Sequence, residues 1–508
     1  MSITRTVIFV HGWSVTNTEC YGELPRRLQH EAAGAGITLK VKEIFLSEYI
    51  SFHDEVRLSD ISRAFRTAVA DTLPEVLKGG QRFVCITHST GGPVIRDWWH
   101  RYYDSIPRSG ICPMSHLIML APANHGSALA QLGKGRLGRL KSWLLDGVEP
   151  GQGVLDWLEL GSAESWNLNA SWNRATGNRI GAKGIFPFVL TGQTIDRKFY
   201  DVLNPYTGEM GSDGVVRVAA ANLNGRLIKL AQQAPIHNAD EEPEAPELRV
   251  EEVVEAPLSA MRLCEGKSHS GETIGIMRSV KKNAKLDPAS TDTVDAILEC
   301  LNVKTKAQYT ALRKRFEKRI REVQKKELVE TETGFLHRER LFFHDRYSMV
   351  VFRVRDDKGH PVTDYDLVLT AGRDSNPNHL PQGFLRDRQR NHLNRETITY
   401  YFNYDAMAGC PEVKNADGKV LREAMPGTES MGLKIIPRPE SGFVHYLPCE
   451  IQASKDLLLQ ALQPNCTTLF DIRLRRIVHK NVFRMDQMTE TTTPKNFKRT
   501  KPGDVIPN

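Results

Sequence analysis

The most informative stretch of the sequence is Phe83-Val84-Cys85-Ile86-Thr87-His88-Ser89-Thr90-Gly91-Gly92. An apolar run ends there, and a single serine is followed closely by two glycines. A serine hydroxyl becomes a useful nucleophile when a sharp strand-to-helix turn exposes it beside a base. The usual pattern is Gly-x-Ser-x-Gly; here Thr87 replaces the first glycine and Gly91 keeps the second. The stretch predicts a nucleophile at Ser89, with an ordinary buried strand end as the alternative.

Short apolar runs bounded by turn residues recur through the first half of the chain, at 7–10, 39–45, 83–86, 116–120, 186–190 and 261–264. Helical patterns lie between them, for example at 58–77 and 92–103. This alternation predicts an α/β fold with a mostly parallel sheet covered on both faces. Catalytic groups on such a sheet emerge at the carboxyl ends of the strands.

The chain has 508 residues, so two or three domains are expected. We predict a catalytic domain over 1–285, in which the Glu-, Pro- and Ala-rich segment 234–257 is an acidic loop. Residues 286–340 are predicted to be a helical linker. Between 341 and 485, β-prone runs separated by turn residues predict a small antiparallel β-sandwich, taken by default as a docking module. Residues 486–508 are predicted to be a polar tail. The apolar face expected on the linker helices comprises Leu298, Leu301, Tyr309, Leu312, Phe316 and Ile320.

The composition, 40% hydrophobic and 25% charged, is that of a soluble globular protein. The N-terminus leads directly into the apolar run at 7–10, which is too short for a signal-peptide core, so we expect synthesis in the cytoplasm without a classical export signal. The eight cysteines are scattered and contain no Cys-x-x-Cys pair. This spacing favours reduced, mostly buried thiols over a disulfide framework or a zinc site.

The net charge of +7 is unevenly distributed, with ten basic and two acidic residues between 304 and 326. This run lacks the interleaved aromatic residues of a nucleic-acid platform, so no nucleic-acid partner is expected. A solvated helix face is the favoured interpretation. Attraction to anionic lipid headgroups is the alternative.

The first apolar run ends in His11-Gly12-Trp13. In serine hydrolases of this topology, such a turn supplies one backbone N–H of the oxyanion hole, and the residue after the nucleophile supplies the other. That predicts an oxyanion hole made by Trp13 and Thr90. The alternative is a plain strand-end turn.

The candidate catalytic acid is Asp213, in Gly211-Ser212-Asp213-Gly214. A carboxylate on a loop after a strand can orient a histidine and stabilise its cation. Asp196 and Asp201 are rival acids, and an ordinary hairpin turn is the structural alternative.

The candidate base is His269, on a glycine-containing loop after the last apolar run, and His237 is the runner-up. Either could be an ordinary surface-loop histidine. His125 comes one strand after the nucleophile, too early for the base, and is expected to pack in a turn.

The order Ser89, Asp213, His269 is that of the α/β-hydrolases. The motifs His-Gly-Trp, Thr-His-Ser-Thr-Gly-Gly, Ala-Pro-Ala-Asn-His-Gly-Ser and Ser-Asp-Gly-Val-Val together resemble those of bacterial and LCAT-type lipases and phospholipases, over about residues 1–280. The chain departs from the pattern at Thr87 and in the acidic insertion before His269. No residues match the calcium site of some bacterial lipases, so neither a metal nor a cofactor is expected.

A helical lid is predicted at about 126–175, where four of the seven tryptophans fall among lysines and arginines. Amphipathic helices of this kind suit a lipid–water interface, and a cap packed on the core is the alternative. The apolar residues concerned are Leu137, Leu140, Trp143, Leu144, Leu145, Leu155, Trp157, Leu158, Trp166 and Trp172.

The resemblance implies a serine lipase or phospholipase that hydrolyses acyl esters at a membrane surface through an acyl-enzyme, with phospholipid favoured over neutral glycerides. An acyltransferase or an intracellular esterase with the same triad is the alternative, and a non-enzymatic binding protein is less favoured. The architecture also resembles antibacterial lipase effectors delivered by type VI secretion. That resemblance would imply an immunity protein, a secretion-machinery partner and a target-cell membrane.

Overall fold

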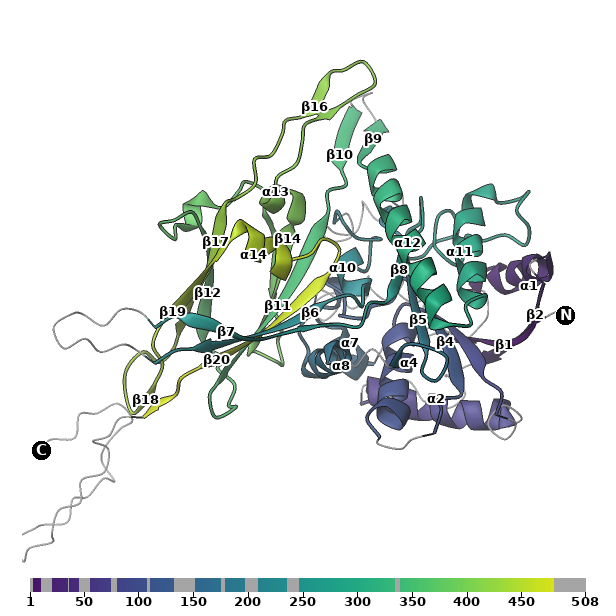
Figure 1. The fold of residues 1–508 in the computed structure, drawn as a ribbon, viewed down its shortest axis with the longest axis horizontal. Coiled ribbons are helices and arrows are strands. Elements are labelled where there is room, and N and C mark those ends of the chain that lie inside the picture. The colour runs from purple at the N-terminus through teal and green to yellow at the C-terminus, as the bar shows by residue number, and fades with distance from the viewer. Residues whose placement is uncertain are drawn as a thin grey trace, which may run out of the picture.

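The computed structural model describes residues 3–10, 21–34, 36–44, 55–74, 80–106, 110–131, 151–174, 179–196, 209–234, 246–333 and 339–478. An α/β domain built around a parallel sheet lies beside a β-rich region (Figure 1). No described helix is long and apolar enough to cross a bilayer.

The parallel sheet has six strands in the order β2-β1-β3-β4-β5-β8, and every neighbouring pair runs parallel. Its strands are β1 (Ile3–Val10), β2 (Ile37–Ile44), β3 (Phe83–His88), β4 (Met114–Leu120), β5 (Phe186–Thr191) and β8 (Ala260–Leu263). Each of the six predicted runs overlaps one of these strands, so the α/β prediction is confirmed. Every residue of β3, β4 and β5 is buried, which explains why these runs are continuously apolar.

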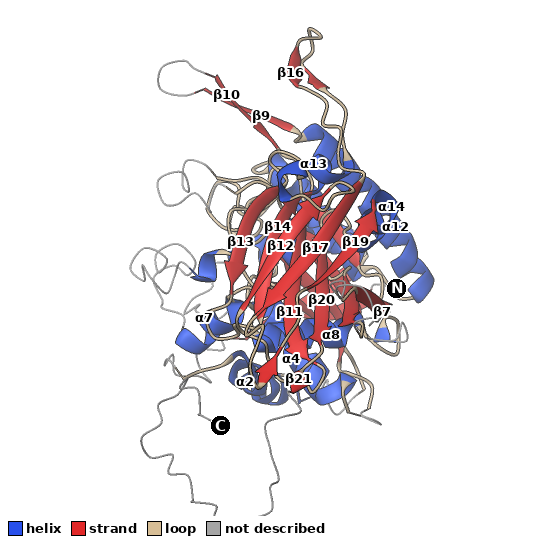
Figure 2. Cartoon of the chain, turned by 90° about the vertical axis from the view of Figure 1, so that its left-hand side faces the viewer, coloured by secondary structure: helices blue, strands red, loops and turns tan. Residues whose placement is uncertain are grey.

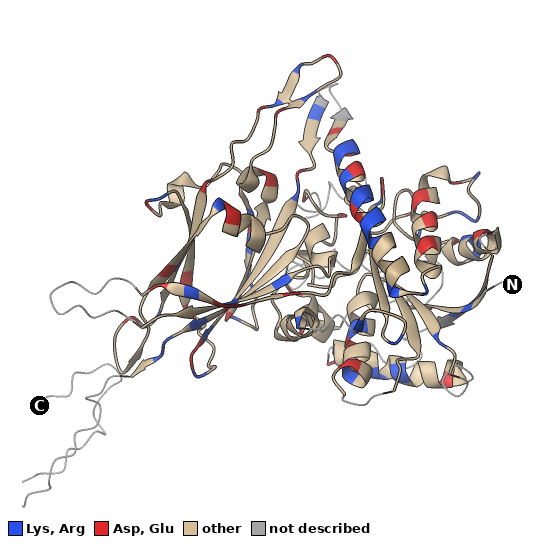
Figure 3. Ribbon diagram, viewed as in Figure 1, with Lys and Arg blue, Asp and Glu red and all other residues tan. Residues whose placement is uncertain are grey.

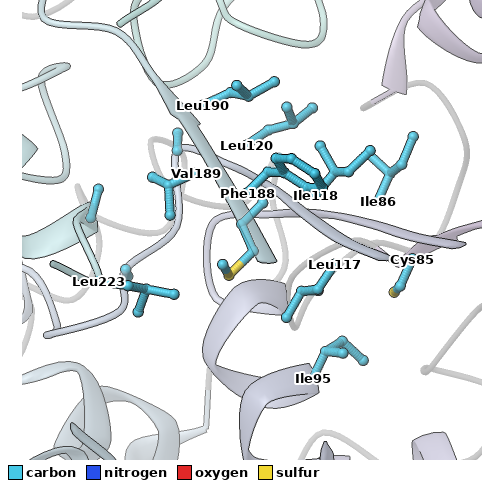
Figure 4. Close-up of a cluster of buried hydrophobic side chains, with 14 of the residues drawn as sticks. Cys85, Ile86, Ile95, Leu117, Ile118, Leu120, Phe188, Val189, Leu190 and Leu223 are labelled. Atoms are coloured by element: carbon cyan, nitrogen blue, oxygen red, sulfur yellow. The ribbon is translucent and has the colours of Figure 1, made fainter. Parts of the chain in front are cut away.

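Helices cover both faces of this sheet (Figure 1). On one face lie α1 (Leu24–Gly34), α11 (Thr291–Leu301) and α12 (Lys306–Lys326); on the other lie α2 (Leu58–Thr72) and α4 (Gly91–Trp99). Figure 4 shows side chains of β3, β4 and β5 gathered with Ile95 of α4 in one buried cluster. This core fixes the strand ends that carry the candidate site. The remaining helical elements are η3 (His100–Asp104), α7 (Gln152–Leu158), α8 (Ala163–Asn173), α10 (Val218–Ala221), η5 (Pro288–Ser290), η6 (Pro377–His379), α13 (Tyr404–Ala408) and α14 (Lys455–Ala461).

The segment predicted to be a helical linker is part of the α/β core. The Tyr309 hydroxyl of α12 donates to the Pro187 carbonyl (2.6 Å) and accepts from the Ala260 N–H (2.9 Å), so it joins β5 to β8. The predicted apolar face is buried against the sheet, with Ile320 partly buried. The helices pack rather than link because that face is continuous with the apolar strands.

The basic residues of α12 lie along its outer side (Figure 3). Arg319 contacts Glu265 (3.0 Å) and Asp292 (3.1 Å), and Arg315 contacts Glu299 (3.1 Å). These surface ion pairs agree with a solvated helix face. Contact with anionic lipid stays a prediction.

The β-rich region contains two sheets that pack face to face over a second buried cluster (Figure 2). The larger sheet has the order β13-β14-β11-β20-β6-β7, and the smaller has the order β12-β17-β19. Their strands are β6 (Arg226–Gln232), β7 (Leu248–Glu255), β11 (Tyr347–Asp356), β12 (Tyr365–Ala371), β13 (Leu385–Arg390), β14 (Thr397–Asn403), β17 (Ser430–Pro437), β19 (Cys449–Ser454) and β20 (Thr467–Leu474). Short two-stranded pairs are formed by β9 (Val329–Thr333) with β10 (Glu339–Phe343), β15 (Val413–Lys414) with β16 (Val420–Arg422), and β18 (Val444–His445) with β21 (Ile477–Val478).

The predicted β-sandwich is present, but its strands are not antiparallel throughout. β20 runs parallel to both β11 and β6, so the larger sheet is mixed. Two of its strands, β6 and β7, come from the half of the chain assigned to the catalytic domain. A parallel neighbour need not be close in sequence, so local turn signals could not reveal it.

The predicted acidic loop is also corrected. Residues Leu248–Glu255 form strand β7, which pairs antiparallel with β6, while 235–245 lie outside the described residues. Glutamates of β7 pair across to β6, with Arg226 contacting Glu255 (2.7 Å) and Lys229 contacting Glu252. The valines between the glutamates give the segment enough β-propensity for an edge strand.

The lid prediction fails for the part of the segment that the structure describes. Trp157 of α7 and both Trp166 and Trp172 of α8 are buried. The Trp172 indole N–H donates to the Leu223 carbonyl (3.0 Å), and the Trp166 ring lies 4.5 Å from the Arg353 guanidinium. These helices form a cap packed on the core, as the alternative had it. Leu137, Leu140, Trp143, Leu144 and Leu145 lie outside the described residues.

The seven cysteines in the described ranges are free thiols, and six of them are buried. This agrees with the expectation from their spacing. Cys20 lies outside the described residues.

Candidate active site

Ser89 occupies a strained turn between β3 and α4. Its φ of +53° is in the left-handed region, which side chains other than glycine rarely adopt. The Ser89 N–H donates to the Leu120 carbonyl (3.0 Å), and the Ser89 carbonyl accepts from the Gly92 N–H (3.1 Å). A Cβ at Gly92 would lie 2.7 Å from the Pro122 Cβ, so this glycine lets α4 pass the segment after β4. The turn therefore holds the serine at the carboxyl end of the sheet.

The structure brings together the three predicted residues Ser89, His269 and Asp213. His269 Nε2 lies 3.0 Å from Ser89 Oγ, and His269 Nδ1 lies 3.0 Å from Asp213 Oδ2. Asp213 is fully buried, and its Oδ1 accepts from the backbone N–H groups of Val215 (3.0 Å) and Val216 (2.8 Å). Serine, imidazole and carboxylate thus form one hydrogen-bonded chain.

The rival residues take other places. His125 is buried, and its backbone N–H donates to the Ala220 carbonyl (3.0 Å). Burial, reinforced by the nearby Arg96 charge, lowers the pKa of His125 to about 3, which keeps the ring neutral. This agrees with a turn-packing role. Asp213 is the carboxylate that His269 contacts, whereas Asp201 and His237 lie outside the described residues.

The buried side chain of Lys267 anchors the loop that carries His269. This buried ammonium donates to the hydroxyls of Ser279 (2.9 Å) and Ser290 (2.6 Å), and burial lowers the pKa of Lys267. The Lys267 carbonyl accepts from the Thr194 N–H (3.2 Å). A Cβ at Gly192 would lie 1.7 Å from that carbonyl oxygen, so only glycine lets the chain after β5 pass so close.

His88 is a site residue that sequence reasoning missed. Its Nε2 lies 2.9 Å from the His269 carbonyl, and the two imidazole rings are 4.9 Å apart. The contact connects the residue before the nucleophile to the backbone of the base. The signal was its place in the Thr-His-Ser-Thr motif, where a histidine ends a mostly apolar strand.

A second missed group joins the nucleophile helix to its neighbours. The buried Arg96 of α4 donates to the side-chain oxygens of Asn124 (3.2 Å) and Asn169 (3.0 Å). Asn124 in turn donates to the Ala221 carbonyl (2.7 Å). Burial lowers the pKa of Arg96 to about 9, against the opposing charge of Asp97. The network fixes α4 against α8 and α10.

The β-rich region contacts the loop that carries Asp213. The Tyr401 hydroxyl of β14 lies 3.0 Å from the Gly211 carbonyl and 3.1 Å from the Met210 carbonyl. Gly211 has a φ of +72°, and a Cβ there would lie 2.4 Å from the Tyr401 hydroxyl. The backbone and the ring therefore fit together only with glycine at this position.

Arg217 makes a second connection between this loop and the β-rich region. Its guanidinium pairs with Glu209 (2.8 Å) and with Asp387 of β13, and lies 4.1 Å from the Tyr401 ring centre. Burial alone would lower the pKa of Arg217, but the two carboxylates outweigh burial and raise it. The β-rich region is thus a structural support of the candidate site, beyond the docking role assigned by default.

The predicted oxyanion hole is only half described. Thr90 follows Ser89 directly and takes the N-cap position of α4, where backbone N–H groups and the helix dipole favour negative charge. Trp13 lies outside the described residues, as do His11 and Gly12. Strand β1 ends beside the nucleophile turn, because Val10 pairs with Thr87, two residues before Ser89. No group of three metal-binding side chains occurs among the residues that the structure describes.

Among the solved structures that resemble the chain, two match all or nearly all of it. The phospholipase PlaB from Legionella pneumophila is 42% identical over 100% of both chains, with a TM-score of 0.82. The same phospholipase in complex with thio-NAD is 42% identical over 97% of both chains, with a TM-score of 0.80. The chain belongs to this phospholipase family. The α/β-hydrolase sheet and the mixed β-rich region are both found in PlaB, and the protein is a carboxylic ester hydrolase. No protein-family model and no curated protein matches the sequence.

Proposed function

We propose that this protein hydrolyses acyl esters of phospholipids through a covalent acyl-enzyme. The observation that carries the proposal is the chain of two 3.0 Å contacts from Ser89 through His269 to Asp213. Full-length membership of a phospholipase family supports phospholipid as the substrate.

In the proposed reaction, Ser89 Oγ attacks the acyl carbonyl while His269 Nε2 takes the hydroxyl proton. Asp213 holds Nδ1 protonated, which keeps the free Nε2 directed at the serine and stabilises the imidazolium. The Thr90 N–H, together with Trp13, stabilises the oxyanion. His269 then donates its proton to the departing alcohol, and a water activated by the same imidazole releases the fatty acid.

The test is the release of free fatty acid from phosphatidylglycerol vesicles and from triglyceride emulsions by the full-length protein. Ser89→Ala should lower turnover by about 10³-fold or more. Ser171→Ala, on α8 and away from this chain of contacts, is the matched control and should retain activity. Unchanged fatty-acid release by Ser89→Ala would contradict the mechanism.

The alternatives give different products. An acyltransferase would pass the acyl group to an added monoglyceride or sterol instead of water, and product analysis separates the two reactions. A non-enzymatic binding protein would leave Ser89 unlabelled by a fluorophosphonate probe.

The prediction of a type VI antibacterial effector has the resemblance of architecture as its only support. It predicts toxicity when the protein is directed to the periplasm, loss of that toxicity in Ser89→Ala, and neutralisation by a dedicated immunity protein. Equal growth with and without periplasmic targeting would contradict it.

The relative solved with thio-NAD supports a ligand proposal: this chain also binds a nicotinamide dinucleotide. Calorimetric titration of the full-length protein with thio-NAD should show saturable binding. Heats indistinguishable from dilution at millimolar ligand would contradict it.

A further inference from the structure

A cavity of about 560 Å³ lies between the two sheets of the β-rich region. Side chains of β6, β11 and β20 line one wall, and side chains of β17, β19 and α14 line the other. Protein interiors are close-packed and rarely leave voids larger than a water molecule, whereas small-molecule sites occupy roughly 300–1,000 Å³. The cavity therefore has the size of a ligand site.

The lining is mostly apolar and follows strand β6 lengthwise; its polar members are Arg226, Glu255, Gln452 and Gln460. Arg226, Ile228 and Leu230 of β6 line the cavity, because alternate residues of a strand share a face. Ile228 lies beside Phe470 of β20 on one side and Val253 of β7 on the other. From Arg226 to Leu230 the strand rises by about 13 Å, at ~3.3 Å per residue. That length is close to half of the ~30 Å hydrocarbon core of a bilayer, the depth that one acyl chain fills.

The cavity opens between the edge strand β7 and helix α14, and its opening is apolar. Val250, Val253 and Leu457 all line the cavity, yet are 55%, 53% and 56% exposed. Apolar side chains gathered at the mouth of a pocket indicate a surface that meets an apolar ligand. The opening is therefore suited to admit a hydrocarbon chain.

One end of the cavity carries a cation. Arg226 contacts Glu255 (2.7 Å), and the Arg226 side chain is only 16% exposed against 65% for Glu255. Thr468 lies beside Arg226 in the sheet, and its hydroxyl donates to the Ala461 carbonyl of α14 (2.7 Å), so the helix closes this end. A guanidinium held in partial desolvation pairs well with a carboxylate or phosphate, and its partner here is an exposed side chain that can move aside.

We propose that this cavity binds one long acyl chain of an anionic single-chain lipid, with the tail along β6 and the headgroup at Arg226. A free fatty acid and a lysophospholipid share this chemistry. The site is separate from Ser89, and binding there requires no catalysis.

The test uses full-length protein carrying Ser89→Ala, so that no ester is consumed. Binding of the 18-carbon fluorescent fatty acid cis-parinarate is titrated below its critical micelle concentration, then competed with palmitate, palmitoyl lysophosphatidylglycerol or octanoate. We expect saturable micromolar binding, with octanoate at least tenfold weaker than palmitate because it fills only part of the cavity. Whichever 16-carbon competitor is tighter identifies the source of the chain.

Variants locate the site. Ala453→Phe, which fills the cavity, should weaken parinarate binding at least tenfold. Arg226→Gln should weaken competition by palmitate more than competition by octanol, an added uncharged competitor that has no anion to pair with the guanidinium. Arg473→Gln, at an exposed position on the neighbouring β20, is the matched control and should bind as the parent does. If Ala453→Phe does not fold, Val253→Glu at the opening takes its place. Absence of parinarate binding by the parent, or equal binding by the parent and the cavity variants, would overturn the proposal.

Discussion

Replacing Tyr401 with phenylalanine tests whether the β-rich region supports the candidate site. The change removes one oxygen atom, the hydroxyl that lies 3.0 Å from the Gly211 carbonyl and 3.1 Å from the Met210 carbonyl. Both carbonyls belong to the loop that carries Asp213. The aromatic ring and its stacking on Tyr347 (ring centres 4.9 Å apart) are retained.

The expected loss of folding free energy follows from the single proton of the Tyr401 hydroxyl. A hydroxyl has one proton to share between the two carbonyls, so one buried hydrogen bond is lost, which costs about 1 kcal/mol of folding free energy. If the same free energy is also lost from the orientation of Asp213 in the transition state, kcat falls by about fivefold, since ~1.4 kcal/mol corresponds to a factor of ten. KM should change little, because Tyr401 is fully buried in the β-rich region.

Tyr400→Phe is the matched control on the same strand. Tyr400 is equally buried, and its hydroxyl donates to the Leu367 carbonyl (2.8 Å) inside the β-rich region. Urea unfolding should show similar losses of stability in both variants, whereas steady-state fatty-acid release should fall only in Tyr401→Phe. Equal kcat values for the two variants would refute the argument that this region positions the catalytic acid.

Three further predictions concern the α/β domain. Asp213→Asn should lower kcat by about 10³–10⁴-fold with Ser89 still in place, because an amide does not hold the imidazole tautomer or stabilise its cation; near-normal turnover on phosphatidylglycerol would contradict this. Gly192→Ala should lower both kcat and the unfolding temperature, because the added methyl would meet the Lys267 carbonyl; a crystal structure with that loop unmoved would count against it. Burial, helped by the Arg5 charge, lowers the pKa of His116 to about 3, below the ~6.5 of the unfolded chain. As the pH falls, the unfolded state therefore binds a proton at this histidine before the folded state does. The folded protein keeps its full stability above about pH 6.5, and the proton bound by the unfolded state progressively lowers the free energy of unfolding as the pH falls toward 3. At pH 5.5 the free energy of unfolding is lower by about 1.4 kcal/mol for this reason. The unfolding temperature should therefore decline less between pH 7.5 and 5.5 in His116→Gln than in the parent. Equal declines in the two proteins would refute the assignment.

The parallel sheet could be predicted from the sequence because strands buried on both faces consist mostly of apolar residues. Strands β3, β4 and β5 are buried throughout and mostly apolar, and the nucleophile motif lies at the end of β3. The order of serine, aspartate and histidine motifs was enough to select the three side chains that the structure brings together. These signals are local, or depend only on order along the chain.

The lid, the acidic loop and the support of the Asp213 loop were missed or mispredicted because each depends on contacts between residues that are far apart in the sequence. Composition cannot tell whether tryptophans near cations face a membrane or a core, and Trp157, Trp166 and Trp172 turned out to be buried. The glutamates of β7 led to the prediction of an acidic loop, although the valines between them favour the strand that pairs with β6. Tyr401 supports a loop that lies 190 residues earlier in the chain, and no local pattern marks such a contact.

Strand β6 has consequences for how the enzyme is made. It lies between β7 and β20, and β20 (Thr467–Leu474) leaves the ribosome long after β6 (Arg226–Gln232) does. Until then one hydrogen-bonding edge of β6 stays open, and the nascent polypeptide cannot complete the sheet that steadies Asp213. The larger sheet can therefore close, and support the loop that carries Asp213, only after β20 has been synthesised.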